Sequence, residues 1–306
     1  MADDDPVTDA APLTERYAEN RRRGLLPWLG PMLGYPGVVW RQRVLVHNFF
    51  RRELLGRFRG SALGIFWVLV QPIFLFAVYF AVFGFLFETR FTPGEGPDAN
   101  FAIYLFSGVL VITAFLEATT RSCTSVVDNG NLVKKVAFPC ELLPVHLGLV
   151  SLLVMLVGVL VLLASGMAFG VVVPGWGLLA LPVVVFLQFV LALGIGLLLA
   201  GLHVFMRDAV QIWSILGQAW MFLSPVFWVM DGPGGFRARL SWAGVLEWNP
   251  LYSIIQAHRL SLGVTPTIVD GTLGGHLLAS AAWAFGCLAL GYTFFMSRRE
   301  KFADLV

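Results

Sequence analysis

Five long stretches without a charged residue constrain this chain more than any other feature of its sequence. They are Gly60–Phe87, Ala99–Leu116, Leu142–Met206, Ala209–Met230 and Gly271–Ser297. A helix needs about 20 apolar residues to cross a bilayer, and a charged side chain at its centre opposes insertion. The third stretch has room for two spans and is divided by the turn signal Pro174-Gly175. The sequence therefore predicts an all-α membrane protein with six transmembrane helices.

The composition excludes a water-soluble protein. Hydrophobic residues make up 58% of the 306 residues and charged residues 13%, whereas soluble domains carry about 25% charged residues. Most soluble enzyme classes are excluded with it. We expect a flexible cytoplasmic tail at 1–35, an amphipathic interfacial helix at 36–59, a six-span domain at 60–297 and a cytoplasmic tail at 298–306.

The distribution of Lys and Arg predicts the orientation. If the N-terminus is cytoplasmic, 17 of the 21 Lys and Arg residues lie in segments on the inner side. Inner segments of membrane proteins carry such an excess of cations. We therefore expect a multi-pass protein of the cytoplasmic (inner) membrane with both termini in the cytoplasm.

The segment before the first predicted span is amphipathic. Val46, Phe50, Leu54 and Phe58 recur every four residues and share one helical face, while Arg residues occupy much of the remainder. This pattern predicts a helix that lies on the membrane surface. It acts either as a simple anchor or as a gate or docking surface at the cytoplasmic mouth of a channel.

Two segments between the spans carry apolar residues that need a partner. Glu117–Glu141 is predicted as a cytoplasmic loop, and its Leu132, Val133 and Phe138 would be buried by either the membrane surface or a protein. On the outer side, Leu251–Ala257 is apolar but too short to span, which is typical of re-entrant or interfacial helices.

Several kinds of chemistry are missing from the sequence. The chain contains no Gly-x-x-x-x-Gly-Lys-[Ser/Thr] motif and only three Lys residues, so it does not bind and cleave ATP through a P-loop. Its five His residues are scattered and lack metal-ligand spacing. We expect no catalytic residue, metal or cofactor on this chain and no nucleic-acid partner. A permease without its own motor is either passive or uses a separate ATPase.

The fifth predicted span carries two different faces. One is a polar stripe of Gln211, Ser214 and Gln218, and the opposite one is an aromatic stripe of Trp213, Trp220 and Phe227. The aromatic side chains face lipid, pack against another helix or stack on sugar rings, and the sequence leaves open which face lines a channel. Trp67 and Gln71 share a face of the first span. A path of amides and aromatics without fixed charge suits a long, polar, neutral or mixed polymer.

Four parts of the chain together resemble a known family. They are Arg52–Trp67, Asn131–Lys135 with Phe138–Pro144, Phe205–Asp208 with Leu223–Trp228, and Asn249–Tyr252 leading to Arg259. In this order, on six spans, they resemble the permease subunits of type-2 ABC exporters, in particular those for O-antigen, capsule or teichoic-acid polysaccharides. The resemblance implies a homodimer, a dimer of a separate ATPase that binds ATP and Mg, and a lipid-linked glycan as cargo.

The resemblance also implies roles for individual residues. The ATPase-coupling residues would be Leu132, Lys134, Lys135, Phe138, Pro139 and Glu141. The cytoplasmic gate would contain Arg51, Arg52, Arg57, Phe58 and Arg59. The external gate would contain Trp248, Asn249, Pro250, Tyr252 and Arg259. The expected substrate path contains Trp67, Gln71, Gln211, Gln218, Trp213, Trp220 and Phe227.

Three other interpretations remain at this point. A type-2 ABC exporter of a small lipid or drug would share the coupling segment and differ in cargo. A glycan-lipid transferase would need acidic residues at the outer interface, for which the candidates are Glu88, Glu95, Asp98, Asp231 and Glu247. These acids form no recognisable pair in the sequence. A purely structural membrane anchor does not explain polar stripes within the spans.

Overall fold

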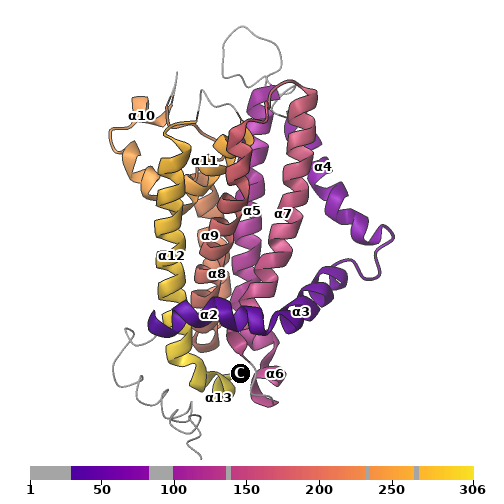
Figure 1. Cartoon of the computed structure of the whole chain (residues 1–306), viewed down its shortest axis with the longest axis vertical. Coiled ribbons are helices and arrows are strands. Elements are labelled where there is room, and N and C mark those ends of the chain that lie inside the picture. The colour runs from indigo at the N-terminus through magenta and orange to yellow at the C-terminus, as the bar shows by residue number, and fades with distance from the viewer. Residues whose placement is uncertain (1–28, 83–98, 136–138, 232–234, 265–268) are drawn as a thin grey trace, which may run out of the picture.

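The described part of the chain is a bundle of helices (Figure 1). The structure, a computed structural model, describes residues 29–82, 99–135, 139–231, 235–264 and 269–306. Its longer helices are α2 (Leu29–Arg41), α3 (Arg43–Gly56), α4 (Trp67–Tyr79), α5 (Ala99–Asp128), α7 (Leu143–Ala168), α8 (Leu181–Phe205), α9 (Ala209–Leu223), α11 (Pro250–Leu262) and α12 (Leu273–Arg298). The shorter ones are η2 (Gly64–Phe66), α6 (Gly130–Lys135), η4 (Cys140–Leu142), η5 (Trp176–Ala180), α10 (Phe236–Arg239), η6 (Ala243–Trp248), η7 (Arg299–Lys301) and α13 (Phe302–Leu305). Apart from one isolated bridge between Val172 and Val264, the described residues form no β-structure.

The helical membrane fold expected from the uncharged stretches is confirmed. Five helical segments of the described chain are long and apolar enough to cross a membrane: Gly64–Val82, Phe101–Asp128, Cys140–Ala168, Trp176–Phe205 and Leu273–Leu305. The turn at Pro174-Gly175 does separate two long helices, as predicted. The expected re-entrant helix is α11, which packs against α12, α5 and α8.

The predicted boundaries of two spans were wrong. Helix α5 does not end at Leu116 but continues to Asp128, and α6 follows at Gly130, so most of the described part of the predicted cytoplasmic loop is helical. The fifth predicted span ends at Leu223 as the 15-residue helix α9, because Ser224 turns into extended backbone ahead of Pro225. A proline disfavours helical backbone in the residue before it. Helix α2 begins at Leu29, within the stretch assigned to the tail, whose residues 1–28 lie outside the described part.

Helix α8 forms the centre of the bundle, with α12 and α5 as its main neighbours. The backbones of α8 and α12 touch where Gly194 faces Gly291: a Cβ atom on Gly291 would collide with the carbonyl oxygen of Gly194. Small residues allow this kind of close approach between membrane helices. The close contact of α8 with α12 therefore depends on two glycines.

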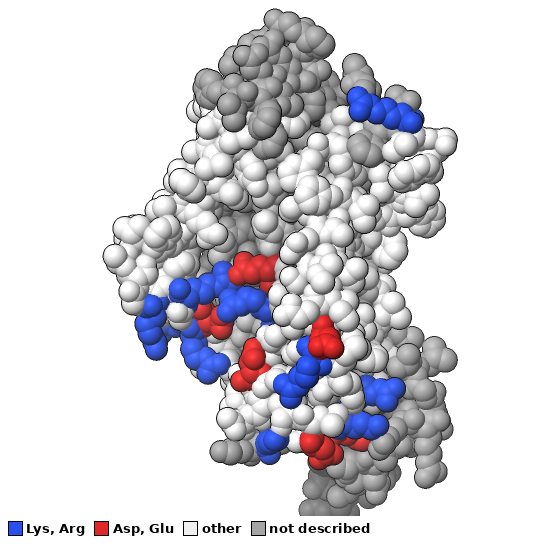
Figure 2. All heavy atoms as spheres, turned by 180° about the vertical axis from the view of Figure 1, so that it is seen from behind, with Lys and Arg blue, Asp and Glu red and all other residues white. Residues whose placement is uncertain are grey.

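Helices α2 and α3 lie across the bundle near one end instead of running along it (Figure 1). Helix α2 contacts α12, and α3 contacts α7. Figure 2 shows charged side chains gathered towards this end, which also carries α6 and α13, and an uncharged band above them. This arrangement is typical of a helix pair at a membrane surface. We refer to this end as the α6 end and to the opposite one as the α11 end.

Candidate functional site

An ion-pair network fastens α3 to α5 at the lower edge of the uncharged band. The carboxylate of Glu117 pairs with Arg57, and that of Glu53 pairs with Arg121. Nη1 of Arg121 also lies 3.9 Å from Oε1 of Glu117 on the same helix. Ion pairs at the end of a span need no water-filled path, so Glu117 serves here as an attachment point for α3.

The residues expected in the cytoplasmic gate do not form one cluster. Arg57 turns inward to Glu117, whereas Arg51, Arg52 and Arg59 are exposed. The guanidinium of Arg52 lies 4.7 Å from the ring centre of Phe49. Phe58 is half-buried in the turn that follows α3. Helix α3 therefore has one fixed edge and one free cationic edge.

A small cavity with several polar lining residues lies beside this network. It has a volume of about 210 Å³ and lies among α3, α4, α5 and α7. Gln71, from the expected substrate path, lines it together with Arg57, Thr113, Glu117 and Ser151. Trp67, one turn earlier, is exposed and donates its indole N–H to Oγ of Ser61 at 2.7 Å. Gln71 thus shares a cavity with the α3–α5 network, and Trp67 does not line it.

Glu141, expected to contact an ATPase, is buried. Its carboxylate Oε2 lies 3.2 Å from Nη1 of Arg299, and its carbonyl oxygen accepts a 2.7 Å hydrogen bond from the hydroxyl of Tyr35. These contacts join the start of α7 to α2 and to the C-terminal segment. Glu141 is in a position to hold the segment before it in place and offers little surface to a partner.

Helix α6, just before Glu141, carries the accessible part of the expected coupling segment. Lys134 is exposed, and Leu132 and Pro139 are half-buried. The side chain of Lys135 and the whole of Phe138 lie outside the described residues. Helix α13 packs against α6, and a Cβ on Gly130 would collide with the side chain of Val306. Buried Phe302, 5.0 Å from Phe295 between ring centres, fixes this C-terminal helix to α12.

The aromatic stripe of α9 faces the interior of this chain. The indole N–H of Trp213 donates to Oγ1 of Thr119 at 3.0 Å, and that of Trp220 donates to Oδ1 of Asn249 at 2.7 Å. Both rings lie edge-on to Phe115 of α5, with ring centres 6.4 and 5.7 Å away. Of the three uses considered for these tryptophans, the geometry favours helix packing. Phe227, beyond the end of the helix, stacks on Phe222 at 5.4 Å.

The polar stripe of α9 points the other way. Gln211 and Gln218 are exposed, together with large apolar neighbours such as Ile215 and Phe222, which are 69% and 63% exposed. Helix α4 is exposed in the same manner: only 11% of its span is buried, and Phe74 is 67% exposed. The amides and these apolar residues therefore form outward surfaces of the chain.

At the α11 end, a buried arginine organises the expected external gate. Arg259 is fully buried; its Nε donates to Oγ of Ser107 at 3.1 Å and its Nη2 to the carbonyl of Tyr104 at 3.0 Å. Its guanidinium carbon lies 3.4 Å from the ring centre of Tyr104, a close cation–π contact. Nη1 donates to Oε1 of Gln256 at 3.2 Å. Arg259 thus fixes α11 to α5.

The other expected external-gate residues surround this helix. Asn249 caps α11, since its Oδ1 accepts from the backbone N–H of Leu251, and Pro250 follows as the first helical residue. The buried hydroxyl of Tyr252 donates to Oδ2 of Asp270 at 2.6 Å. Trp248 is 77% exposed. Only this last residue offers a large free surface among the five.

Two of the acidic residues considered for a transferase are bound to the same arginine. Asp231 and Glu247 are both bound to Arg237, at 2.7 Å from its Nε and 2.6 Å from its Nη2. Glu88, Glu95 and Asp98 lie outside the described residues. Within the described chain, no group of three or more His, Cys, Asp or Glu side chains is arranged to hold a metal ion.

Some of these residues were not predicted from the sequence. Tyr104, Gln256, Asp270 and Arg299 complete the networks around α11 and Glu141. The first three stand alone in an apolar or loop context in the sequence, and Arg299 belongs to the charged run Arg298–Lys301. The pair Glu117 and Arg121, spaced by four residues, was the available signal that α5 continues beyond its apolar part. The spacing of residues in the sequence did not indicate that Glu117 and Arg121 pair with Arg57 and Glu53.

Comparison with known proteins gives a consistent result. The family described as ABC-2 type transporter matches residues 45–262, from α3 to the end of α11. The chain is 28% identical over 268 residues to the O-antigen export system permease protein RfbA of Myxococcus xanthus, covering 88% of this chain and 97% of that protein. It is 21% identical over 257 residues to the protein of the same name from Klebsiella pneumoniae, covering 83% and 92%. It is 23% identical over 260 residues to the polysialic acid transport protein KpsM of Escherichia coli, covering 85% and 95%.

Proposed function

Because this chain belongs to the ABC-2 type transporter family, we propose that it is the membrane permease of an exporter that moves a lipid-linked polysaccharide across the cytoplasmic membrane. The observation that carries this proposal is the similarity along almost the full length of the O-antigen export permease of M. xanthus. A transporter of this family works with a separate ABC ATPase, so ATP is hydrolysed on another chain.

Both termini lie in the cytoplasm in this proposal. The α6 end, with α2, α3 and α13, then faces the cytoplasm, and the α11 end faces outward. The cations of α3 and of the C-terminal segment support this orientation, because cytoplasmic segments carry an excess of Lys and Arg.

The ATPase docks on α6 and the residues that follow it. Leu132, Lys134, Lys135, Phe138 and Pro139 provide the contact surface, while Glu141 anchors the segment through Arg299. Exposed Lys134 and the packing of α13 behind α6 support this division. Force from the ATPase would pass through Glu141 into α7 and α2.

The permease works as a homodimer with the outward surfaces of α4 and α9 turned towards the second copy. Exposed apolar residues on α4 and exposed amides on α9 support this arrangement, because amides avoid lipid. The polysaccharide passes along Gln211 and Gln218, with Trp67 and Gln71 near its entry. Trp213, Trp220 and Phe227 hold α9 in position beside the path.

The two ends of the path are closed by different elements. Helix α3 and the turn that follows it form the cytoplasmic gate, with Arg51, Arg52, Arg57, Phe58 and Arg59. This element rotates around the point where its ion pairs attach it to α5. Trp248 to Tyr252 and α11 close the outer mouth. Arg259 keeps α11 aligned from within the bundle.

The test is co-expression of the full chain with each ABC ATPase encoded beside its gene, followed by purification in mild detergent. We expect a stable complex whose ATP hydrolysis rises when lipid-linked glycan extracted from the source cells is added. Failure of every neighbouring ATPase to co-purify would contradict the permease assignment. A stable complex stimulated by a small lipid or drug, but not by the glycan, would contradict the cargo.

A pair of variants tests the docking surface. Lys134→Glu should reduce the amount of co-purified ATPase, because it reverses an exposed charge on α6. Arg239→Glu, which reverses an exposed cation near the α11 end, should leave the complex intact. Equal recovery of the ATPase with both variants would contradict docking on α6.

A further inference from the structure

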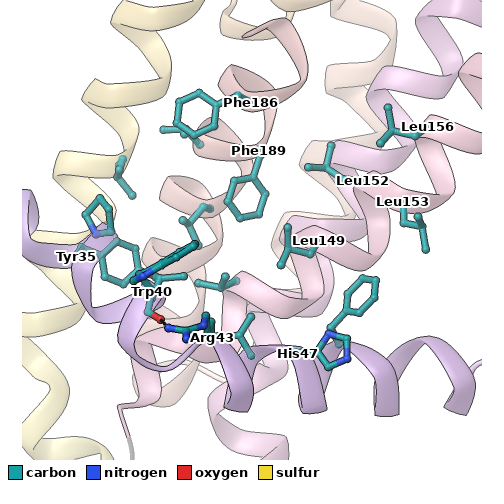
Figure 3. Close-up of a pocket in the computed structure, with 18 of the residues that line it drawn as sticks. Tyr35, Trp40, Arg43, His47, Leu149, Leu152, Leu153, Leu156, Phe186 and Phe189 are labelled. Carbon is teal, nitrogen blue, oxygen red and sulfur yellow. Dashed lines mark hydrogen bonds between the residues drawn. The ribbon is translucent and has the colours of Figure 1, made fainter. Parts of the chain in front are cut away.

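A large apolar groove lies between the surface helices and the membrane-spanning bundle (Figure 3). Its volume is about 720 Å³, which is within the usual range of ligand sites, roughly 300–1,000 Å³. Its walls come from α7, α8 and α12, and its lower end comes from α2 and α3. None of its lining residues belongs to α4, α5 or α9, so it is separate from the proposed substrate path.

The walls of the groove are hydrocarbon-like. Figure 3 shows Leu149, Leu152 and Leu153 of α7 on one side and Phe186 and Phe189 of α8 on the other. Phe186 is 53% exposed, so the groove opens sideways into the membrane. An apolar surface that opens within the spanning region is in contact with acyl chains.

The polar side chains of the groove gather at its lower end. Arg43 and His47 of α3 line it together with Trp40 of α2, and all three are exposed. The guanidinium of Arg43 lies 5.2 Å from the ring centre of Trp40 and donates to the carbonyl of Trp40 at 3.4 Å. Among the described residues, no acidic side chain lines the groove. The donors of Arg43 that do not bind Trp40 are therefore available to an anion at the membrane surface.

This combination selects one kind of occupant. An acyl chain matches the walls, and a phosphate matches an arginine and a histidine at headgroup level, where tryptophan is also favoured. Basic residues near the cytoplasmic surface attract anionic lipids. A neutral lipid would fill the walls but leave Arg43 without its counter-charge.

We propose that this groove binds one anionic phospholipid of the surrounding bilayer, with an acyl chain between α7 and α8 and its phosphate at Arg43 and His47. The lipid would sit between the surface helices and the bundle, and would hold α2 and α3 against the spans. It is a structural ligand, because the groove does not border the α4 and α9 surfaces.

The experiment measures lipid retention by the full chain. The protein is purified in mild detergent, exchanged into vesicle lipids of either phosphatidylglycerol or phosphatidylcholine, and examined by native mass spectrometry. We expect one phosphatidylglycerol per chain to survive partial delipidation and phosphatidylcholine to be lost. Equal retention of the two lipids would overturn the proposal.

Three variants locate the site. Arg43→Ala should weaken retention roughly tenfold, as expected for the loss of one charge-assisted hydrogen bond, and Arg43→Lys should restore most of it. Arg41→Ala, an exposed cation on α2 that does not line the groove, is the matched control and should retain the lipid. Loss of lipid with Arg41→Ala as well would indicate unspecific attraction and overturn the site.

A filling variant tests the walls independently of charge. Leu153→Trp places a large ring in the groove and should displace the acyl chain while leaving Arg43 in place. Full retention by a folded, monodisperse Leu153→Trp protein would overturn the placement of the chain.

Discussion

Long apolar helices occur both at the centre of the bundle and in its outer layer, but the two groups are held very differently. Helices α5 and α8 have 78% and 72% of their most apolar stretches buried within the chain, whereas α4 has 11%. Helix α8 contains Gly194, Gly196 and Gly201, and α4 contains no glycine. Lipid is as apolar as a leucine side chain, so apolarity alone does not drive helices together. Close backbone contacts and buried polar contacts separate the fixed interior from the outer layer.

The largest effect is expected at the contact of α8 with α12. Gly291→Leu should destabilise the protein by at least about 3 kcal/mol, because the added side chain has to displace the backbone of Gly194. Gly286→Leu on the same helix is the control, since a Cβ there meets no atom within 4 Å. Thermal unfolding in detergent measures both. Similar midpoints for the two variants would show that the glycine contact does not hold the interior together.

The next effect concerns the buried arginine of α11. Arg259→Met should cost about 2–3 kcal/mol, because Ser107, Gln256 and the carbonyl of Tyr104 lose their donor inside the protein. Arg237→Met removes exposed ion pairs at the same end and should cost less than about 1 kcal/mol. The same unfolding measurement compares them. A larger loss with Arg237→Met would contradict the assignment of Arg259 to the fixed interior.

A substitution of Trp220 tests whether the aromatic face of α9 belongs to the fixed interior or to the substrate path. Trp220→Phe keeps the ring against Phe115 but removes the hydrogen bond to Asn249, so a loss of about 1 kcal/mol is expected. Export should remain close to normal once the amount of folded protein is matched. Loss of export without loss of stability would instead place this ring on the substrate path.

The sequence was sufficient to predict the membrane fold because insertion depends on local hydrophobicity. The apolar stretches identified the helices, and Pro174-Gly175 divided the longest one correctly. The predicted end of α5 was wrong because Glu117 and Arg121 indicated a loop by their charge. In the structure Glu117 pairs with Arg57, just after α3, and Arg121 pairs with Glu53 of α3. Charge limits where a helix can meet lipid but does not limit where it can meet another helix.

The sequence predicted which residue types belong to the candidate site but not which other residues they contact. The period of α9 separated its amides from its tryptophans, yet the side that faces the chain's own core depends on Phe115 and Thr119, about a hundred residues earlier. The family resemblance implied that Arg259 belongs to an external gate and that Glu141 contacts an ATPase. Both are buried, since distant residues such as Tyr104 and Arg299 supply their partners.

A smaller effect is expected where the outer layer is tied to the interior. Glu117→Gln should cost only about 0.5–1 kcal/mol, because its ion pair with Arg57 is partly exposed. Its main consequence should be local: faster hydrogen–deuterium exchange in α3, with α8 unchanged. Arg51→Gln on the exposed edge of α3 is the control and should not alter exchange. Unchanged exchange with Glu117→Gln would mean that the ion pairs do not hold α3.

The smallest effect on stability should come from the amide face of α9. Gln218→Leu changes an exposed side chain, so stability should stay within about 0.5 kcal/mol of the original protein. Export of the glycan should nevertheless fall, because an amide that could contact the polymer is replaced by an apolar group. Ile212→Leu, an exposed conservative change on the same helix, is the control and should export normally.

The outcome for Gln218→Leu separates the two regions most sharply. A stable variant with poor export would support the proposal that the amide face of α9 lines the substrate path at the surface turned towards a second copy. A stable variant with normal export would leave α9 as a helix that merely faces lipid. In that case the path would have to be sought along α4, where Gln71 shares its cavity with Arg57 and Glu117.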